Sequence, residues 1–141
     1  MRQTWNRGDI LKIGLPGGRT STCQMLEEPE FAFFAPNDSS QLLFRIWVHK
    51  SAYSSGRWEK IGNSEIPPEL ASEVPRFNQD PISGSLSIHQ SGREYSATEE
   101  ECVKLERAAV WEPNHVEDRI TDHIEGKENV WVQSLALKPA I

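Results

Sequence analysis

Alternating apolar and polar positions in the first half of the chain predict β-strands. Residues 9–15 contain the alternating run Leu-Lys-Ile, and the following PGG supplies a proline and two glycines for a hairpin turn. We expect the returning strand at 19–26, a short apolar strand at 31–35 and a loop at 36–40. The start of the chain is therefore predicted to be antiparallel sheet.

The strongest strand prediction falls on residues 42–49, with the sequence LLFRIWVH. The even-numbered residues from Leu42 to Val48 are all apolar and share one face of an extended strand, so that face is expected to contact the core. A loop at 51–56 and a further strand at 57–62 follow.

Prolines are frequent in the middle of the chain, with four of them in residues 67–81. Proline removes a backbone donor and restricts the residue before it, so regular elements are expected to be short there. A polar hairpin is predicted at 85–96, turning at Ser91 and Gly92. Apolar anchors of the proline-rich segment are expected at Leu70, Val74 and Phe77.

Helix signals are concentrated in the last third. Thr98, followed three residues later by Glu101, forms a capping box that predicts the start of a helix. This helix is expected to bury Cys102, Leu105 and Ala109, before the chain becomes a strand within 108–111.

A second helix is predicted over residues 113–125. Pro113 suits the first helical position, and Trp111 before the cap can pack on Val116 as a hydrophobic staple. Gly126 is the expected stop. The core face of this helix is expected to be Val116, Ile120 and Ile124, and a last strand is predicted at 130–137.

The order of these elements predicts an α+β fold in a single domain over residues 1–141. We expect a curved, mostly antiparallel sheet, partly an SH3-like barrel, with one or two C-terminal helices packed on it.

Composition favours a globular protein without membrane spans. Hydrophobic residues make up 37% of the chain and charged residues 26%, and no apolar run is long enough to cross a bilayer. The N-terminus lacks the apolar region of a signal peptide, so we expect a cytoplasmic location. Cys23 and Cys102 are then expected to be reduced packing residues.

Charge is distributed unevenly along the chain. Residues 1–60 carry eight Lys or Arg and six Asp or Glu, a net charge of +2, whereas residues 94–128 carry four and eleven, a net charge of −7. So acidic a surface disfavours nucleic-acid binding and favours a basic partner. On charge alone, a face that only aids solubility is the simpler interpretation.

The segment NHVEDRITDH, residues 114–123, raises the alternative of a metal or acid–base site centred on His115 and Asp118. Metal ligands must converge on one point. On a helix, His115 and His123 are roughly 12 Å apart along the axis, and the HExxH spacing is missing. We therefore expect a solvated helix face, no catalytic or metal-binding residue and no cofactor.

A further alternative is a module that binds a small molecule or a peptide. It would use Trp47, Tyr53 and Trp58 as an aromatic cleft on the predicted barrel. Ligand-dependent tryptophan fluorescence would favour this alternative, and a stoichiometric metal ion would favour an enzyme.

Three separated stretches resemble a known family, the immunity protein 26 family of bacterial polymorphic-toxin systems. They are GDILKIGLPGGRTSTCQML, LLFRIWVHKSAYSSGRWEKIG and CVKLERAAVWEPNHVEDRITDHIEG, which cover about half of the chain in order. The resemblance implies a non-enzymatic cytoplasmic protein that binds and neutralises a cognate secreted toxin domain. Residues that match the family pattern are Trp111, Pro113, His115, Asp118 and Arg119.

Two sets of residues follow from this interpretation. The expected framework of the last helix is Trp111, Pro113, Val116, Arg119 and Ile120. Many toxin domains that act on nucleic acids or nucleotides are basic, so acidic side chains can occupy positions meant for phosphates. The expected toxin-binding residues are Asp38, Glu99, Glu100, Glu101, Asp118 and Asp122.

Overall fold

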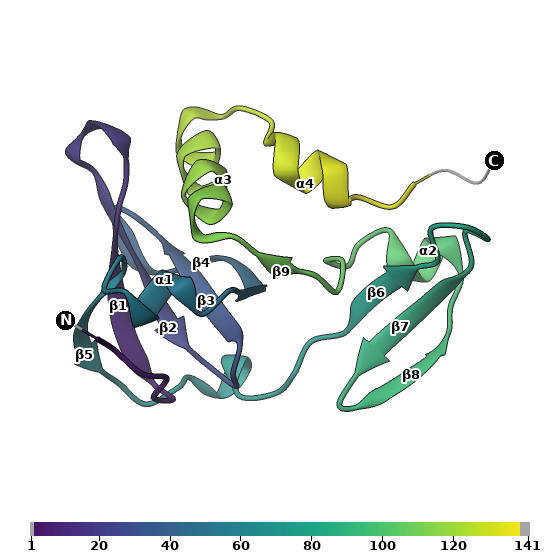
Figure 1. Ribbon diagram of the computed structural model, residues 1–141, viewed down its shortest axis with the longest axis horizontal. Coiled ribbons are helices and arrows are strands. Elements are labelled where there is room, and N and C mark those ends of the chain that lie inside the picture. Colours follow the sequence, from purple (N-terminus) through teal and green to yellow (C-terminus); the bar gives the residue numbers. More distant parts are fainter. Residues whose placement is uncertain (1, 139–141) are drawn as a thin grey trace. The chain divides into compact units, whose positions relative to one another are not determined.

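The computed structural model describes residues 2–138, which divide into two compact units (Figure 1). Within the described residues, unit 1 contains 2–71 and Val110–Asn129, and unit 2 contains Ser72–Ala109 and 130–138. The expectation of one domain over 1–141 stays a prediction, because a single domain can itself contain two compact units.

Unit 1 is built on a six-stranded sheet in the order β5-β1-β2-β3-β4-β9. Neighbouring strands are antiparallel except β4 and β9, which pair in parallel. The strands are β1 (Asp9–Gly14), β2 (Thr20–Met25), β3 (Glu30–Ala35), β4 (Asp38–Val48), β5 (Glu59–Asn63) and β9 (Val110–Trp111). The helices of unit 1 are α1 (Ser51–Ser54) and α3 (Pro113–Glu125), with 3₁₀ turns at Pro16–Gly18 and Pro68–Leu70.

Unit 2 contains a three-stranded antiparallel sheet in the order β6-β7-β8. Its turn at Ser91 and Gly92 has φ values of 53° and 76°, which are typical of a two-residue hairpin, so the polar hairpin is confirmed. The elements of unit 2 are β6 (Arg76–Gln79), β7 (Leu86–Gln90), β8 (Arg93–Ser96), α2 (Glu99–Cys102) and α4 (Val130–Leu135). Its core consists of Phe77, Ile88 and Cys102.

The predicted α+β class, with a mostly antiparallel sheet, is confirmed. The larger sheet ends at β5 on one side and β9 on the other, so the described strands do not close into the expected barrel. In residues 2–138, no helix has both the length and the apolar character that a membrane crossing requires.

One face of the larger sheet, here called the core face, holds an aromatic core. Trp58 is fully buried and meets Phe31 and Phe33 edge-on, with ring centroids 5.6 Å apart in both pairs. Such edge-to-face pairs add to the stabilisation from burial alone. Trp5 and Tyr53 extend the cluster from the N-terminal segment and from α1. The N-terminal segment and α1 therefore cover the same face.

Helix α3 has the predicted bounds and also packs on the core face. Val116 and Ile120 are fully buried, whereas Ile124 is half-buried. The helix ends at Gly126, whose φ of 68° belongs to the left-handed region that glycine adopts without strain. Helix α3 therefore begins at the predicted Pro113 and ends at the predicted stop, Gly126.

The strand at 42–49 differs from its prediction at one end. Phe33 pairs with Phe44, but Phe34 pairs with Leu42, so a bulge places one extra residue in β4. Leu42 consequently lies on the opposite face from Phe44 and is 41% exposed. The prediction that Leu42 faces the core is wrong, because the bulge interrupts the two-residue period.

The expected helix after Thr98 is only four residues long. Beyond it, the backbone N–H of Phe77 donates to the carbonyl of Glu106, and the N–H of Ala108 donates to the carbonyl of Phe77. These bonds extend the chain alongside β6. Tertiary pairing therefore overrides the helical pattern.

Two other expectations are wrong. The loop at 51–56 contains helix α1, and the strand at 130–137 is helix α4. A short apolar run such as Val-Trp-Val fits either a strand or a helix by periodicity. The Arg107 guanidinium donates to the carbonyls of Leu135 and Ala136, which satisfies acceptors at the end of α4. No sequence pattern near residues 130–137 predicts that Arg107 caps this helix.

Candidate functional site

The charged side chains of α3 divide into those that hold the fold and those that face solvent. Glu117 belongs to the first group. Its carboxylate accepts bonds from Arg57 Nε and Nη2 at 2.8 and 2.7 Å, and from the indole of Trp58 at 2.9 Å. The hydrogen bond that Arg57 donates to Glu117 also raises the pKa of Arg57. Sequence reasoning missed Glu117, although a buried tryptophan N–H such as that of Trp58 requires an acceptor.

Arg119, expected in the framework, contacts aromatic rings of the core face. Its guanidinium carbon lies 3.9 Å from the ring centroid of Phe44 and 5.1 Å from that of Trp111. Stacking of this kind holds a cation against an aromatic face. The other framework residues, Trp111, Pro113, Val116 and Ile120, are all buried.

The two aspartates of α3 have different surroundings. Asp118 is exposed, whereas Asp122 is half-buried and accepts a bond of 2.9 Å from the side-chain amide of Asn129. At the end of the helix, hydrogen bonds first from Lys127 and then from Arg19 lower the pKa of Glu125. Asp118 is therefore the more exposed of the two aspartates.

The histidines of α3 do not form a metal cluster with their neighbours. Within the described part of the chain, no three His, Cys, Asp or Glu side chains are grouped closely enough to hold a metal ion. His115 is half-buried and His123 is exposed.

The acidic residues of α2 belong to unit 2. Glu101 forms the predicted capping box: it accepts from the Thr98 N–H at 2.9 Å, and its own N–H donates to the Thr98 hydroxyl at 3.2 Å. These contacts lower the pKa of Glu101, mainly through the backbone N–H of Thr98. Glu99 and Glu100 are exposed in the same turn. Glu101 therefore caps its helix, and the other two carboxylates face solvent.

Asp38, the remaining expected contact residue, lies at the exposed start of β4. Its carboxylate accepts from the hydroxyl and the backbone N–H of Ser40, and these two bonds lower its pKa in that order of importance. Asp38 thus holds the first residues of β4 in a defined conformation.

The expected aromatic cleft is not formed. Trp58 is fully buried in the core and Tyr53 is 6% exposed. Trp47 alternates with the buried Ile46 and Val48, and so belongs to the other face of the sheet. These three aromatic residues therefore do not share one surface.

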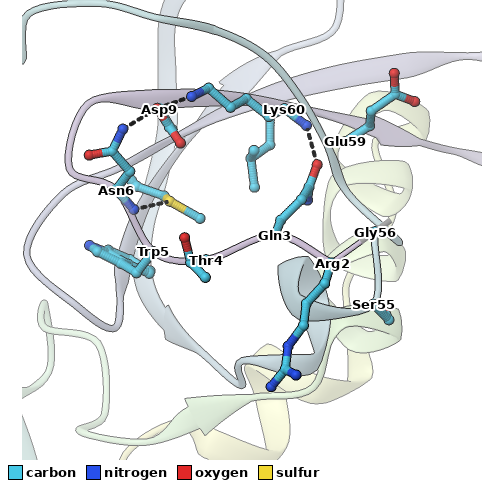
Figure 2. A pocket seen from close by; sticks show the side chains of 12 residues that line it. Arg2, Gln3, Thr4, Trp5, Asn6, Asp9, Ser55, Gly56, Glu59 and Lys60 are labelled. Carbon is cyan, nitrogen blue, oxygen red and sulfur yellow. Dashed lines mark hydrogen bonds and ion pairs between the residues drawn. The ribbon is translucent and has the colours of Figure 1, made fainter.

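A polar pocket of about 810 Å³, here called the N-terminal pocket, lies where the N-terminal segment crosses β1 and β5. Figure 2 shows Asn6 and Lys60 both pointing toward Asp9. Asp9 is 3% exposed, and its Oδ1 accepts from Asn6, Asn63 and Lys60 at 3.0 to 3.2 Å. This buried carboxylate is thus neutralised by the protein's own Lys60.

Gln3 fixes the N-terminal segment beside this pocket. Its side-chain amide donates to the carbonyls of Tyr53 and Trp58, and its oxygen accepts from the N–H of Lys60 at 2.8 Å. The pocket is therefore preformed and can admit a small polar molecule.

A second concavity, here called the sheet groove, lies on the face of the sheet opposite the core face. It has a volume of about 520 Å³. Its floor combines Ile10, Thr22, Phe34, Leu42 and Ile61, which come from five adjacent strands. Its remaining sides are formed by Ser39 and Ser40, by Gln24, and by residues of the segment 64–70.

Comparisons with known proteins found no counterpart of this chain: a scan against protein-family models, a search of curated proteins and a search of solved structures each returned no match. The resemblance to the immunity protein 26 family therefore stays a prediction.

Proposed function

We propose that this protein is an immunity-type inhibitor, which binds a cognate toxin domain in the cytoplasm and blocks it by protein–protein contact. The observation that carries the proposal is the exposure of carboxylates in the acidic segment 94–128. Asp118 on α3 and Glu99 and Glu100 on α2 are exposed, while Val116 and Ile120 of α3 and Cys102 of α2 are buried.

A basic toxin surface is the partner that suits these carboxylates. Opposite charges steer the encounter and accelerate association, and this acceleration weakens as salt is added. A carboxylate can also occupy a position that the toxin uses for a phosphate group. The inhibitor itself then needs no cofactor, and inhibition follows from occupancy of the toxin surface.

Co-expression tests this proposal. The protein encoded by the adjacent gene should stop growth when made alone, and this chain should restore growth and co-purify with it. If the adjacent product is harmless, or if it is toxic but neither neutralised nor bound, the proposed function is wrong.

Charge reversal then tests whether these carboxylates attract the partner. Asp118→Lys, or Glu99→Lys with Glu100→Lys, should slow association and reduce its dependence on salt, because fewer attractive pairs remain. Glu27→Lys serves as the control, since Glu27 is an exposed carboxylate outside the expected contact set. Equal association rates for all variants would show that these carboxylates do not attract the partner.

A second candidate function is the binding of a small polar molecule in the N-terminal pocket. The observation in its favour is the volume of this pocket, which falls in the range usual for ligand sites. Trp5 lines the pocket, so a bound molecule should change tryptophan fluorescence, and Trp5→Phe should remove that change. A metabolite screen with no saturable change would exclude this function for the compounds screened.

A further inference from the structure

We propose that the sheet groove is the docking site for the basic partner, and that it receives an apolar side chain flanked by Lys or Arg. This inference rests on the proposed function, because the partner it describes is the toxin domain.

The floor of the sheet groove exposes apolar side chains. Leu42 is 41% exposed and Ile61 is 52% exposed, while Ile10 and Phe34 between them are half-buried. Strand pairing places Phe34 opposite Leu42, and the sheet order puts β1, β2 and β3 between Leu42 and Ile61. The groove thus crosses the strands and offers apolar surface that a partner can bury.

The segment 64–70, which forms one wall of the groove, is held by two buried polar side chains. Gln24 donates to the carbonyl of Ser64 at 2.9 Å. Arg45 donates to the carbonyl of Leu70 at 3.4 Å and is paired with a buried glutamate of β3. Because both ends of the wall are anchored, binding requires little ordering of this segment, and more of the contact energy appears as affinity.

The charge of the groove selects a basic partner. Among the described residues that line it, Glu65 and Glu69 are acidic and none is basic. Asp38 adds a carboxylate at the rim through its bonds to Ser40. Lys12 lies on the same face, where it is in register with Glu59 of β5. An apolar centre with a charged rim is the usual composition of an energetically important contact.

The volume of the groove fits this occupant. About 520 Å³ falls within the range of sites that enclose small ligands, and so is large enough for one or two side chains of a loop or helix. Acidic residues beside the groove would then pair with Lys or Arg of the same partner segment.

The test measures the affinity of the full chain for the adjacent gene product, inactivated so that it can be purified. Leu42→Ser and Ile61→Ser should each weaken binding at least about tenfold. The control variant Ile82→Ser also removes an exposed apolar side chain, but from unit 2, and should bind within about twofold of wild type. Urea unfolding of each variant checks that the fold is intact.

A second set of variants tests the groove without removing its apolar floor. Ser39→Arg adds bulk and positive charge to an exposed lining residue, so it should repel the partner. Glu65→Gln with Glu69→Gln should weaken binding and reduce its salt dependence, whereas Glu27→Gln should leave both unchanged.

The outcomes separate the two proposals. If wild type binds and the Leu42, Ile61 and Ser39 variants bind equally well, the groove is not the docking site and the proposed function stands. If wild type neither binds nor neutralises the adjacent product, both are overturned. Selective loss of binding in the groove variants supports both.

Discussion

The two faces of the larger sheet differ in how far their apolar side chains are buried. On the core face, Phe31, Phe33 and Ile46 are at most 1% exposed. On the opposite face, Leu42 and Ile61 keep about half of their surface in solvent. Both faces belong to the same strands, so strand propensity does not explain the contrast.

The contrast arises from what covers each face. Helices α1 and α3 contribute side chains to the core face, and Trp58 donates hydrogen bonds to both, from its backbone N–H to Ala52 and from its indole to Glu117. The opposite face is contacted by the short segment 64–70, whose Leu70 packs on Leu26 and Ala32. Apolar residues of the covered face should therefore determine stability, and those of the groove should determine binding. The following predictions test this division.

The largest expected effect is that of Trp58→Ala. Removing a fully buried indole leaves a cavity beside Phe31 and Phe33 and should cost about 3–5 kcal/mol of unfolding free energy. Leu42→Ala, on the groove face, should cost less than about 1 kcal/mol. Urea unfolding of both variants measures the difference. Similar losses of unfolding free energy would contradict the division between residues for stability and residues for binding.

The buried ion pair beneath the groove wall should give the next largest effect. Glu30→Gln removes one partner of Arg45, with which it makes a 3.0 Å contact, and should cost about 3 kcal/mol. Replacing both residues, as Glu30→Leu with Arg45→Met, should recover part of this loss because the two charges of this pair are removed together. A double variant as unstable as the single one would show that the pair itself is required.

Glu117→Gln should have a smaller effect, of about 1 kcal/mol. It weakens the charge-assisted bonds from Arg57 and Trp58, but Arg57 is 46% exposed, so solvent screens much of the attraction. Glu125→Gln is the control, because its partners Arg19 and Lys127 are both exposed. In thermal or urea unfolding, Glu117→Gln should be less stable than wild type, and Glu125→Gln should have a stability close to that of wild type.

The smallest effect concerns pH. Because folding lowers the pKa of Glu101, its ionised form stabilises the native state above its ordinary pKa, and this stabilisation is lost as the pH falls through the lowered pKa. Between about pH 6 and pH 3, wild type should therefore lose more stability than Glu101→Gln. If the urea midpoints of the two proteins changed equally with pH over this range, the prediction would be contradicted.

Sequence reasoning succeeded where the signals are local. The glycines after β1, the turn at Ser91 and Gly92, and the interval from Pro113 to Gly126 each specify a backbone conformation within a few residues. It failed where the backbone conformation depends on contacts with residues that are distant in the sequence. The bulge at Leu42, the pairing of β6 with the chain after α2, and the cap that Arg107 supplies to α4 all depend on such contacts.

The candidate site was predictable only in part. The acidic character of the last third is visible in the sequence, and so is the exposed position of Asp118 on its helix. The sheet groove is not, because its floor combines residues from five strands and its wall comes from the proline-rich segment that carries few structural signals. One clue was available for Glu117, since the indole of Trp58 needed a buried acceptor.

Hydrogen exchange on the complex with the adjacent gene product tests the central claim most directly. Backbone amides of residues 39–42 and 61–70 should gain protection on binding, while amides of residues 31–33 in the central strand β3 should not change. Protection confined to other surfaces, with 39–42 and 61–70 exchanging as in the unbound protein, would contradict it.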